Sequence, residues 1–314
     1  MNESNKENFN DPHFSDDDID LRELFDVIWK GKKLIILITS VIAISSIVYS
    51  LMLPNYYSSE SLLVARDSQS SNALSQYSDL ASLAGVAIPS SGDTSVYEVM
   101  EIIKSREFVK HLMTFENVLP SIMAAKSYDT ASKKLYFDPD IYDEKTAIWT
   151  RKPSNNKGIK PSYLEAHKEY LGGLLSISLD KKTGLVSITI EHISPIFAKD
   201  FLALVIREAN SLNREIDIDN STKALSYLKT ELSQTSLVEI KKSINQLIEA
   251  QLETRMMASV HDEYSLISLE PPFIPEEKSR PSRSLIVILA TMLGGMLSVM
   301  SVLVRHYVFR QRIN

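Results

Sequence analysis

Two long uncharged stretches dominate the pattern of hydrophobic and polar positions along the chain. Residues 34–53 and residues 284–304 each contain roughly twenty residues without a charge, and no other part of the sequence sustains such a run. At a helical rise of about 1.5 Å per residue, either stretch matches the hydrocarbon core of a bilayer, which is about 30 Å thick. A buried core helix is the alternative, but such helices rarely exceed about 14 unbroken apolar residues. The pattern therefore predicts two transmembrane helices, at 34–53 and 284–304.

The first stretch has the properties of an uncleaved anchor. It is longer than the apolar part of a signal peptide, which is about 7–15 residues, and no A-x-A-like cleavage site follows it. A polar, acidic leader at 1–19 precedes it, and this composition predicts disorder. Apolar residues recur at helical spacing in the segment 20–33, which we expect to be an amphipathic helix at the membrane interface.

Basic residues set the expected orientation. They flank both stretches on the side of the chain termini, as Lys30, Lys32, Lys33, Arg305, Arg310 and Arg312. The positive-inside rule then predicts that the leader and the tail at 305–314 are cytoplasmic and that the segment 54–283 lies on the other side of the membrane, in the periplasm. Basic residues within 278–283 argue weakly for the opposite orientation, but long translocated loops largely escape the rule.

The segment 54–283 mixes strand and helix signals. Residues 56–66 are typical of a strand, and an amphipathic helix is expected over about 93–115. The segments 174–180 and 185–193 alternate apolar and polar residues at a period of two, and Lys-Lys-Thr-Gly joins them. This pattern predicts a β-hairpin.

A very long helix is expected beyond the hairpin. Ser194 is a typical N-cap and Pro195 suits the first turn of a helical pattern that runs over about 195–260. No glycine or proline occurs between Ile196 and Leu269. The polar stretch at 217–220 could bend it. Some sixty helical residues would reach about 90 Å, so we expect this helix to project and to find partners. A short strand at 264–269 follows.

Two segments near the second apolar stretch suggest roles in stiffness and packing. Spaced prolines make 271–281 an extended strut rather than a flexible tether, although an ordinary solvated linker is the alternative. Within the predicted second span, Ala290, Gly294 and Ser298 form a stripe of small residues flanked by Gly295. Small residues let helix backbones approach, so this stripe predicts helix–helix packing in the bilayer, although small residues are common in such helices.

Composition narrows the possible functions. The chain has 314 residues, a net charge of −6 and no cysteine. The acidic balance argues against nucleic acid as a partner. The absence of cysteine excludes disulfides, iron–sulfur clusters and a cysteine nucleophile.

Candidate catalytic and metal-ligating residues do not form a recognisable site. The six histidines have no HExxH or paired metal spacing. The acidic segment 138–144 lacks the glycine and ligand spacing of a calcium loop, which favours a solvated turn. No G-x-x-x-x-G-K-[ST] motif occurs, and no carboxylate pair stands out among 40 acidic residues. We therefore expect no catalytic residue, no cofactor, no metal and no enzymatic activity.

Several of these features occur together in the Wzz-type chain-length determinants, the polysaccharide co-polymerases of bacterial inner membranes. The chain resembles this family from about Asp18 to Arg312. The most specific part of the resemblance is the segment PPFIPEEKSRPSRSLIVILATMLGG. It matches the family's proline-rich signature and the glycines of its second span at Pro271, Pro272, Pro275, Lys278, Pro281, Gly294 and Gly295. An alanine-rich segment at 80–86 is shared with related capsule and exopolysaccharide proteins and identifies only the superfamily.

The resemblance implies a membrane-anchored α/β fold with two transmembrane helices, an α/β base, a long projecting helix and ring-like homo-oligomers. It also implies non-enzymatic control of the modal chain length of a surface polysaccharide, commonly O-antigen lipopolysaccharide. The implied partners are the inner membrane, a Wzy-type polymerase and its lipid-linked glycan. A template for polymerases and a ruler that contacts the sugar both remain open. The alternative is an adaptor for capsule or exopolysaccharide export that activates a separate cytoplasmic tyrosine kinase, although the short tail at 305–314 offers little docking surface.

Overall fold

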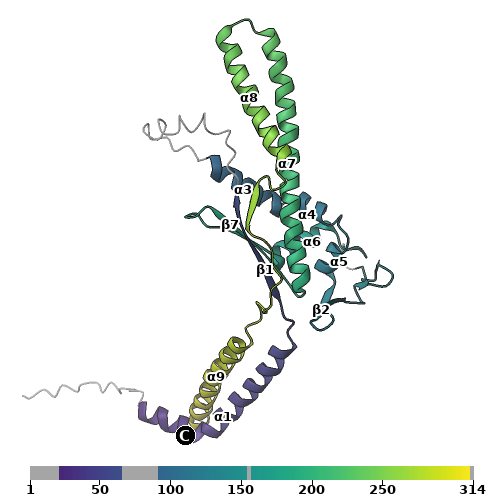
Figure 1. The fold of residues 1–314 in the computed structure, drawn as a ribbon. Helices are drawn as coiled ribbons and strands as arrows, with labels where there is room; N and C mark the ends of the chain where they lie inside the picture. Colours follow the sequence, from purple (N-terminus) through teal and green to yellow (C-terminus); the bar gives the residue numbers. More distant parts are fainter. Residues whose placement is uncertain (1–20, 66–90, 154–156, 312–314) are drawn as a thin grey trace, which may run out of the picture. The chain divides into compact units, whose positions relative to one another are not determined.

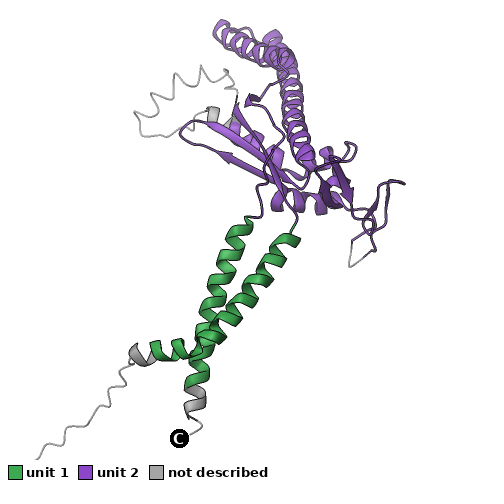
Figure 2. Cartoon of the chain, turned by 60° about the horizontal axis from the view of Figure 1, so that its bottom comes forward, with its two compact units in different colours: residues 1–53, 282–314 green, residues 54–281 purple. Residues whose placement is uncertain are grey.

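The computed structural model of the chain describes residues 21–65, 91–153 and 157–311, and these residues form two units (Figure 2). Unit 1 combines the two ends of the chain, up to Leu53 and from Ser282 onward, and unit 2 spans Pro54–Pro281. The predicted leader at 1–19 and the alanine-rich segment at 80–86 lie outside the described residues.

Unit 1 is a pair of long helices, α1 (Leu21–Met52) and α9 (Arg283–Gln311). Within the described residues, these two are long and apolar enough to cross a membrane, over Phe25–Met52 and Arg283–His306. Only 11% and 17% of the residues in their most apolar windows are buried, whereas a core helix of a soluble protein would be mostly buried. The predicted spans at 34–53 and 284–304 fall on these helices, and the predicted interfacial helix at 20–33 is continuous with α1.

Unit 2 is built on a four-stranded antiparallel sheet with the order β6-β7-β1-β8. Its strands are β1 (Tyr57–Ala65), β6 (Leu175–Leu179), β7 (Leu185–His192) and β8 (Leu266–Glu270). The predicted hairpin is confirmed as β6 and β7, which pair from Leu175 opposite Ile190 to Leu179 opposite Val186. The first strand to follow α1 and the last strand to precede α9 are therefore neighbours in one sheet.

Helices cover one face of this sheet (Figure 1). The elements that contact the sheet are α3 (Ser91–Lys104), a π-helical turn η2 (Tyr170–Leu174) and α7 (Pro195–Gln234). The short helices α4 (Arg106–Leu112), α5 (Val118–Met123) and α6 (Tyr163–Glu169) pack on these elements and on one another. Ser194 caps α7 as predicted, because its side chain accepts a hydrogen bond from the backbone N–H of Phe197. Two small hairpins lie beside the helices: β2 (Ala125–Asp129) with β3 (Lys134–Phe137), and β4 (Tyr142–Asp143) with β5 (Ile148–Trp149).

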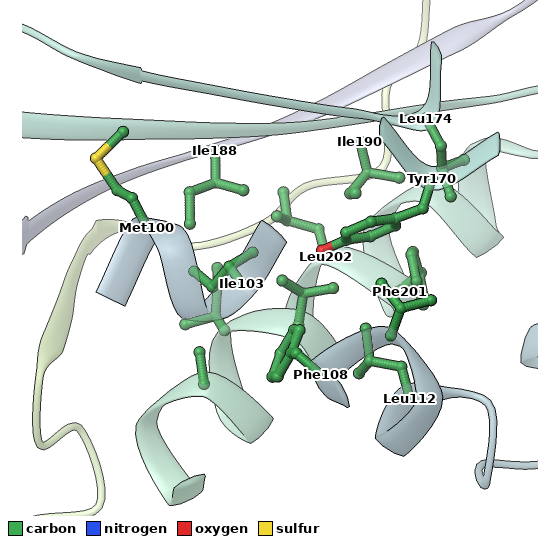
Figure 3. Close-up of a cluster of buried hydrophobic side chains, with 14 of the residues drawn as sticks. Met100, Ile103, Phe108, Leu112, Tyr170, Leu174, Ile188, Ile190, Phe201 and Leu202 are labelled. Atoms are coloured by element: carbon green, nitrogen blue, oxygen red, sulfur yellow. The ribbon is translucent and has the colours of Figure 1, made fainter. Parts of the chain in front are cut away.

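The hydrophobic core lies between the sheet and the helices (Figure 3). Every second residue of β7 is fully buried, as the period of two requires, and Ile188 and Ile190 point from the sheet into the core. Tyr170, Phe201 and Leu202 meet them from the helical layer. Burial of apolar surface between these two layers is what stabilises unit 2.

The prediction of one helix over about 195–260 is wrong in a single respect. The chain ends α7 at Gln234, takes extended backbone angles at Thr235, and begins α8 (Val238–Val260), which returns alongside α7 (Figure 1). The predicted bend at 217–220 does not interrupt α7. The long projecting element is thus a helical hairpin, and the predicted class, long helices on an α/β base with a candidate membrane helix at each end, is confirmed.

The hairpin buries only part of the apolar stripe that a single helix would expose, because Ile240, Leu247 and Met256 remain 45%, 53% and 59% exposed. Leu225 of α7 and Ile244 of α8 are 4% and 8% exposed. At the reversal, Ser233, Thr235 and Ser236 carry hydroxyls that compete for backbone hydrogen bonds and weaken a helix. No glycine or proline marks this turn, which is why the helical pattern alone did not reveal it.

Candidate functional site

The predicted strut at 271–281 follows β8 and is fastened to the sheet. Two serines of β1 make this attachment: Ser59 Oγ donates a hydrogen bond to the carbonyl of Phe273 (2.7 Å), and Ser61 Oγ donates to that of Glu270 (2.6 Å). Both serines are fully buried, so these hydrogen bonds are shielded from water. The segment is therefore tied along the strand that follows α1 in the chain.

A second attachment, which we call the Glu191 clamp, holds the far end of the strut. It consists of Tyr56, Glu191, Ser279 and Arg280. The backbone N–H of Tyr56 donates to the carbonyl of Arg280 (2.9 Å), and the N–H of Ser279 donates to the carbonyl of Tyr56 (2.8 Å). The hydroxyl of Ser279 and Nε of Arg280 both donate to Glu191 Oε1, at 2.7 and 2.6 Å.

Electrostatics reinforce the Glu191 clamp. A second guanidinium nitrogen of Arg280 contacts the other carboxylate oxygen of Glu191, which completes a bidentate ion pair. Hydrogen bonding to Glu191 raises the pKa of Arg280. Residues 54–56, next to the end of α1 in sequence, and 279–281, next to the start of α9, are consequently held together at β7.

The predicted strut residues lie at different depths on unit 2. Pro275 is buried, Pro272 and Pro281 are half-buried, and Pro271 and Lys278 are exposed. Sequence reasoning missed the partners of the strut, namely Ser59, Ser61, Tyr56 and Glu191. A serine or a glutamate in a predicted strand does not indicate which distant segment it will contact. Their partners become apparent only once β1, β7 and β8 are aligned in the sheet.

The small residues of α9 lie in the contact between the two helices of unit 1. Gly294 and Ser298 are buried there, Ala290 is half-buried, and the hydroxyls of Thr39 and Ser298 are 3.3 Å apart. A Cβ added to Gly294 would lie 3.1 Å from Cβ and 2.9 Å from Cγ2 of Ile42, whereas one added to Gly295 would meet no atom of the described residues within 4 Å. Of the two adjacent glycines, only Gly294 is required by close packing.

Because Gly294 is closely packed and Gly295 is not, Gly295 can serve as the control in a test of helix packing. Because the chain has no native cysteine, a Thr39→Cys/Ser298→Cys variant should form one disulfide on mild oxidation in membranes, since the parent hydroxyls are 3.3 Å apart. Adding Gly294→Val should slow this cross-link, because overpacking typically costs about 1–3 kcal/mol. Adding Gly295→Val should leave the rate unchanged. Equal rates for the two glycine variants, measured by the gel shift on reduction, would contradict the assigned packing.

His192, at the end of β7, is the buried titratable group next to the clamp residue Glu191 in sequence. Its Nε2 donates to the carbonyl of Ser121 (2.9 Å), its Nδ1 accepts from the N–H of Ser194 (3.0 Å), and its ring packs on Phe197 at 4.5 Å. These contacts require the neutral ring with the proton on Nε2. Burial lowers the pKa of His192 to about 4.

His192 should make the stability of unit 2 depend on pH. In the unfolded chain this imidazole binds a proton at about pH 6.5, and in the folded chain only near pH 4. The stability that neutral His192 contributes to unit 2 is therefore complete above pH 6.5 and is lost as the pH falls to about 4. The full loss amounts to at most about 3 kcal/mol. Thermal unfolding of the detergent-purified protein between pH 7 and 4 should show it, and His192→Gln should flatten the profile. If stability depended on pH as steeply in His192→Gln as in the parent, His192 would not be the titrating group.

The described residues contain no group of three or more histidine or acidic side chains placed to hold a metal ion. In the acidic segment 138–144, Asp138 accepts the backbone N–H of Asp140 and Asp143 accepts that of Lys145, so these carboxylates close local turns. Hydrogen bonds within its turn lower the pKa of Asp143.

Comparison with known proteins finds one sequence family that matches part of this chain. The sequence model of the family described as "Wzz: Chain length determinant protein" matches residues 17–114, which include α1, β1, α3 and α4. This part of the chain is similar to the Wzz family. The resemblance expected from the sequence is therefore confirmed over residues 17–114.

Two solved structures are similar to this chain. One is described as a "full-length bacterial polysaccharide co-polymerase", with 14% identity over 93% of this chain and 99% of that chain and a TM-score of 0.39. The other is a fragment of WzzB, a polysaccharide co-polymerase from Salmonella Typhimurium, with 13% identity over 72% of this chain and 100% of that chain and a TM-score of 0.28. TM-scores at this level do not establish a common fold. No curated protein matches the chain significantly.

Proposed function

We propose that this chain sets the modal length of a surface polysaccharide, O-antigen lipopolysaccharide, as a non-enzymatic scaffold. Copies of the chain assemble into a homo-oligomer in the inner membrane, and unit 2 meets a Wzy-type polymerase and its lipid-linked glycan in the periplasm. The observation that carries the proposal is the Wzz match over residues 17–114, on a chain whose two candidate membrane helices flank one α/β unit.

The fastening of the strut supports a scaffold role. A regulator that acts by geometry needs a stiff link between its periplasmic part and its membrane helices. The buried serines of β1 and the Glu191 clamp hold the segment 271–281 against the sheet, and its prolines restrict the remaining backbone freedom. In this proposal Pro271, Pro272, Pro275, Lys278 and Pro281 form the strut. The stripe of Ala290, Gly294 and Ser298, flanked by Gly295, packs the membrane helices.

The proposed topology places 1–33 and 305–314 in the cytoplasm and 54–283 in the periplasm. Basic residues on the terminal sides of both apolar stretches support this orientation. A reporter enzyme active only in the periplasm, fused near residue 150, should be active. Activity of a cytoplasmic reporter at the same position would reverse the topology.

Electrophoresis of the surface polysaccharide tests the function directly. Deleting the gene should leave polymer synthesis intact but replace the modal cluster of bands by a broad distribution, and the parent gene should restore the cluster. Unchanged banding would reject the proposal. Loss of all polymer, together with loss of tyrosine phosphorylation on a cytoplasmic kinase, would instead favour an export adaptor.

A substitution in the Glu191 clamp tests whether attachment of the strut affects chain length. Glu191→Ala removes an ion pair in which the side chains of Arg280 and Glu191 are 62% and 16% exposed, and its loss should cost no more than about 3 kcal/mol of stability. It should nevertheless broaden the polysaccharide bands, because the far end of the strut loses its attachment. Glu270→Ala is the matched control, since Glu270 is exposed and the contact with Ser61 involves its backbone carbonyl. Identical banding in both variants at normal protein levels would show that the clamp does not act on chain length.

A further inference from the structure

A cavity of about 730 Å³ lies in unit 2, away from the strut and its clamp. Its walls come from the turn before α5, the β2–β3 hairpin and the β4–β5 hairpin. The volume is within the range of small-molecule sites, about 300–1,000 Å³. Neither the scaffold role nor the packing of the core accounts for a hollow at this place.

The floor of the cavity is apolar and aromatic. Leu135 and Phe137 are half-buried, and Tyr142 is 8% exposed. The ring of Tyr142 packs between Phe137, at a centroid distance of 5.5 Å, and Trp149, at 4.9 Å. This aromatic cluster fixes the floor, because each ring is held by the next.

The rim is polar and its charges balance. Lys134 and Glu144 form an ion pair across it at 3.2 Å. Glu116, Asn117 and Lys133 are exposed at the rim, and among the residues that the structure describes their side chains have no hydrogen-bond or ion-pair partner. A carboxylate, an amide and an ammonium are thus available around an apolar floor, with two positive and two negative charges in all.

The backbone around the cavity is strained at three points. In the described residues, the non-glycine positions with positive φ are Asn117 (63°), Lys133 (54°) and Ala147 (54°), and all three line this cavity. Left-handed backbone is uncommon for lysine and alanine and costs of order 1–3 kcal/mol per residue. Such strain gathers at ligand sites, and here it occurs in three separate loops that meet at one hollow.

We propose that this cavity binds a saccharide segment of the surface polysaccharide whose length the chain determines, so the inference rests on the proposed function. A sugar ring has an apolar C–H face, which suits the floor of Phe137 and Tyr142, and hydroxyl edges that both donate and accept hydrogen bonds. Glu116 accepts from such hydroxyls, Lys133 donates to them, and Asn117 does both. The balanced charge of the rim suits a ligand of low net charge.

Tryptophan fluorescence can report occupancy of the cavity. The chain has two tryptophans, and Trp149 packs on Tyr142 of the cavity floor, so a Trp29→Phe background leaves Trp149 as the single reporter. The probe is the mixture of oligosaccharides released by mild acid from the surface polysaccharide of the producing cells, added to the full chain in detergent. We expect a saturable change in Trp149 emission, and no change with dextran at equal concentration.

Two exposed rim variants and their controls decide the assignment. Glu116→Ala and Lys133→Asn, in which asparagine tolerates the positive φ, should each weaken probe binding about tenfold or more, the loss of a hydrogen bond to a charged group. Glu107→Ala and Lys145→Asn, exposed residues of the same types that do not line the cavity, should bind like the parent. Absence of a saturable signal, an equal response to dextran, or equal affinity in rim and control variants would overturn the inference.

The outcome also separates this inference from the proposed function. If deletion of the gene scatters chain length but the purified chain binds no oligosaccharide, the scaffold role stands and the saccharide site fails. If deletion leaves the banding unchanged, the proposed function fails whatever the cavity binds.

Discussion

Phe201→Ala is expected to lower the free energy of unfolding of unit 2 by about 3–5 kcal/mol, the usual cost of truncating a buried phenylalanine. Phe201 is 2% exposed on α7 at the centre of the core (Figure 3). Its ring stacks on Phe197 at 5.2 Å and meets the edge of Tyr170 at 6.1 Å. Truncation therefore loses apolar burial and two aromatic contacts, and leaves a cavity between α7 and η2.

Tyr170→Phe is the matched control in the same core. The hydroxyl of Tyr170 is buried and forms no hydrogen bond with any residue that the structure describes, and burial raises the pKa of this group. Removing it keeps the ring in place and takes away a desolvated polar atom, so stability should stay the same or increase. Thermal unfolding of the detergent-purified chain, followed by near-ultraviolet circular dichroism, measures both variants. A loss below about 1 kcal/mol for Phe201→Ala would mean that this core is not closely packed.

The folding elements that the sequence predicts well are those with a strict period. β7 alternates buried and partly buried residues along its whole length, and Ser194 with Pro195 marks the start of α7. A count of consecutive uncharged residues was enough to predict the two long apolar helices of unit 1. In each case the signal is local, because burial on one face imposes the pattern on consecutive residues.

The features that the sequence hides depend on contacts between distant segments. The reversal at Thr235 is invisible because the apolar residues keep helical spacing on both sides of it, and only packing of α8 on α7 distinguishes a hairpin from a continuous helix. Glu191 and Arg280 are 89 positions apart, so neither looks unusual alone. The cavity combines three loops from the segment 116–147, in which turn residues give no sign of a common site.

Asn210→Ala should have the second largest effect on stability. Asn210 is 2% exposed on α7, and its side chain satisfies three backbone groups at the start of β8. Its Oδ1 accepts from the N–H groups of Ser265 and Leu266, both at 2.8 Å, and its Nδ2 donates to the carbonyl of Leu266 at 2.9 Å. Each buried group left without a partner costs about 1–3 kcal/mol, so we expect a total loss of about 3 kcal/mol or more.

Asn213→Ala is the control on the next turn of α7. Asn213 is half-buried and its side chain donates to the hydroxyl of Ser265, a contact that water can replace. Its loss should cost no more than about 1 kcal/mol. Equal effects of the two substitutions would show that Asn210 does not anchor β8.

The Asn210 variant should also change local dynamics in a way that links stability to function. Leu266 pairs with Ala65 of β1, and the strut at 271–281 begins directly after β8. Once Asn210 no longer holds the first residues of this edge strand, β8 should open more often than the rest of the sheet. Hydrogen exchange should then accelerate at the amide of Leu266 while that of Ile188, in the neighbouring strand pair β6–β7, stays protected. Uniform acceleration across both strands would instead indicate global destabilisation, and the strut would then depend on the whole sheet rather than on this one side chain.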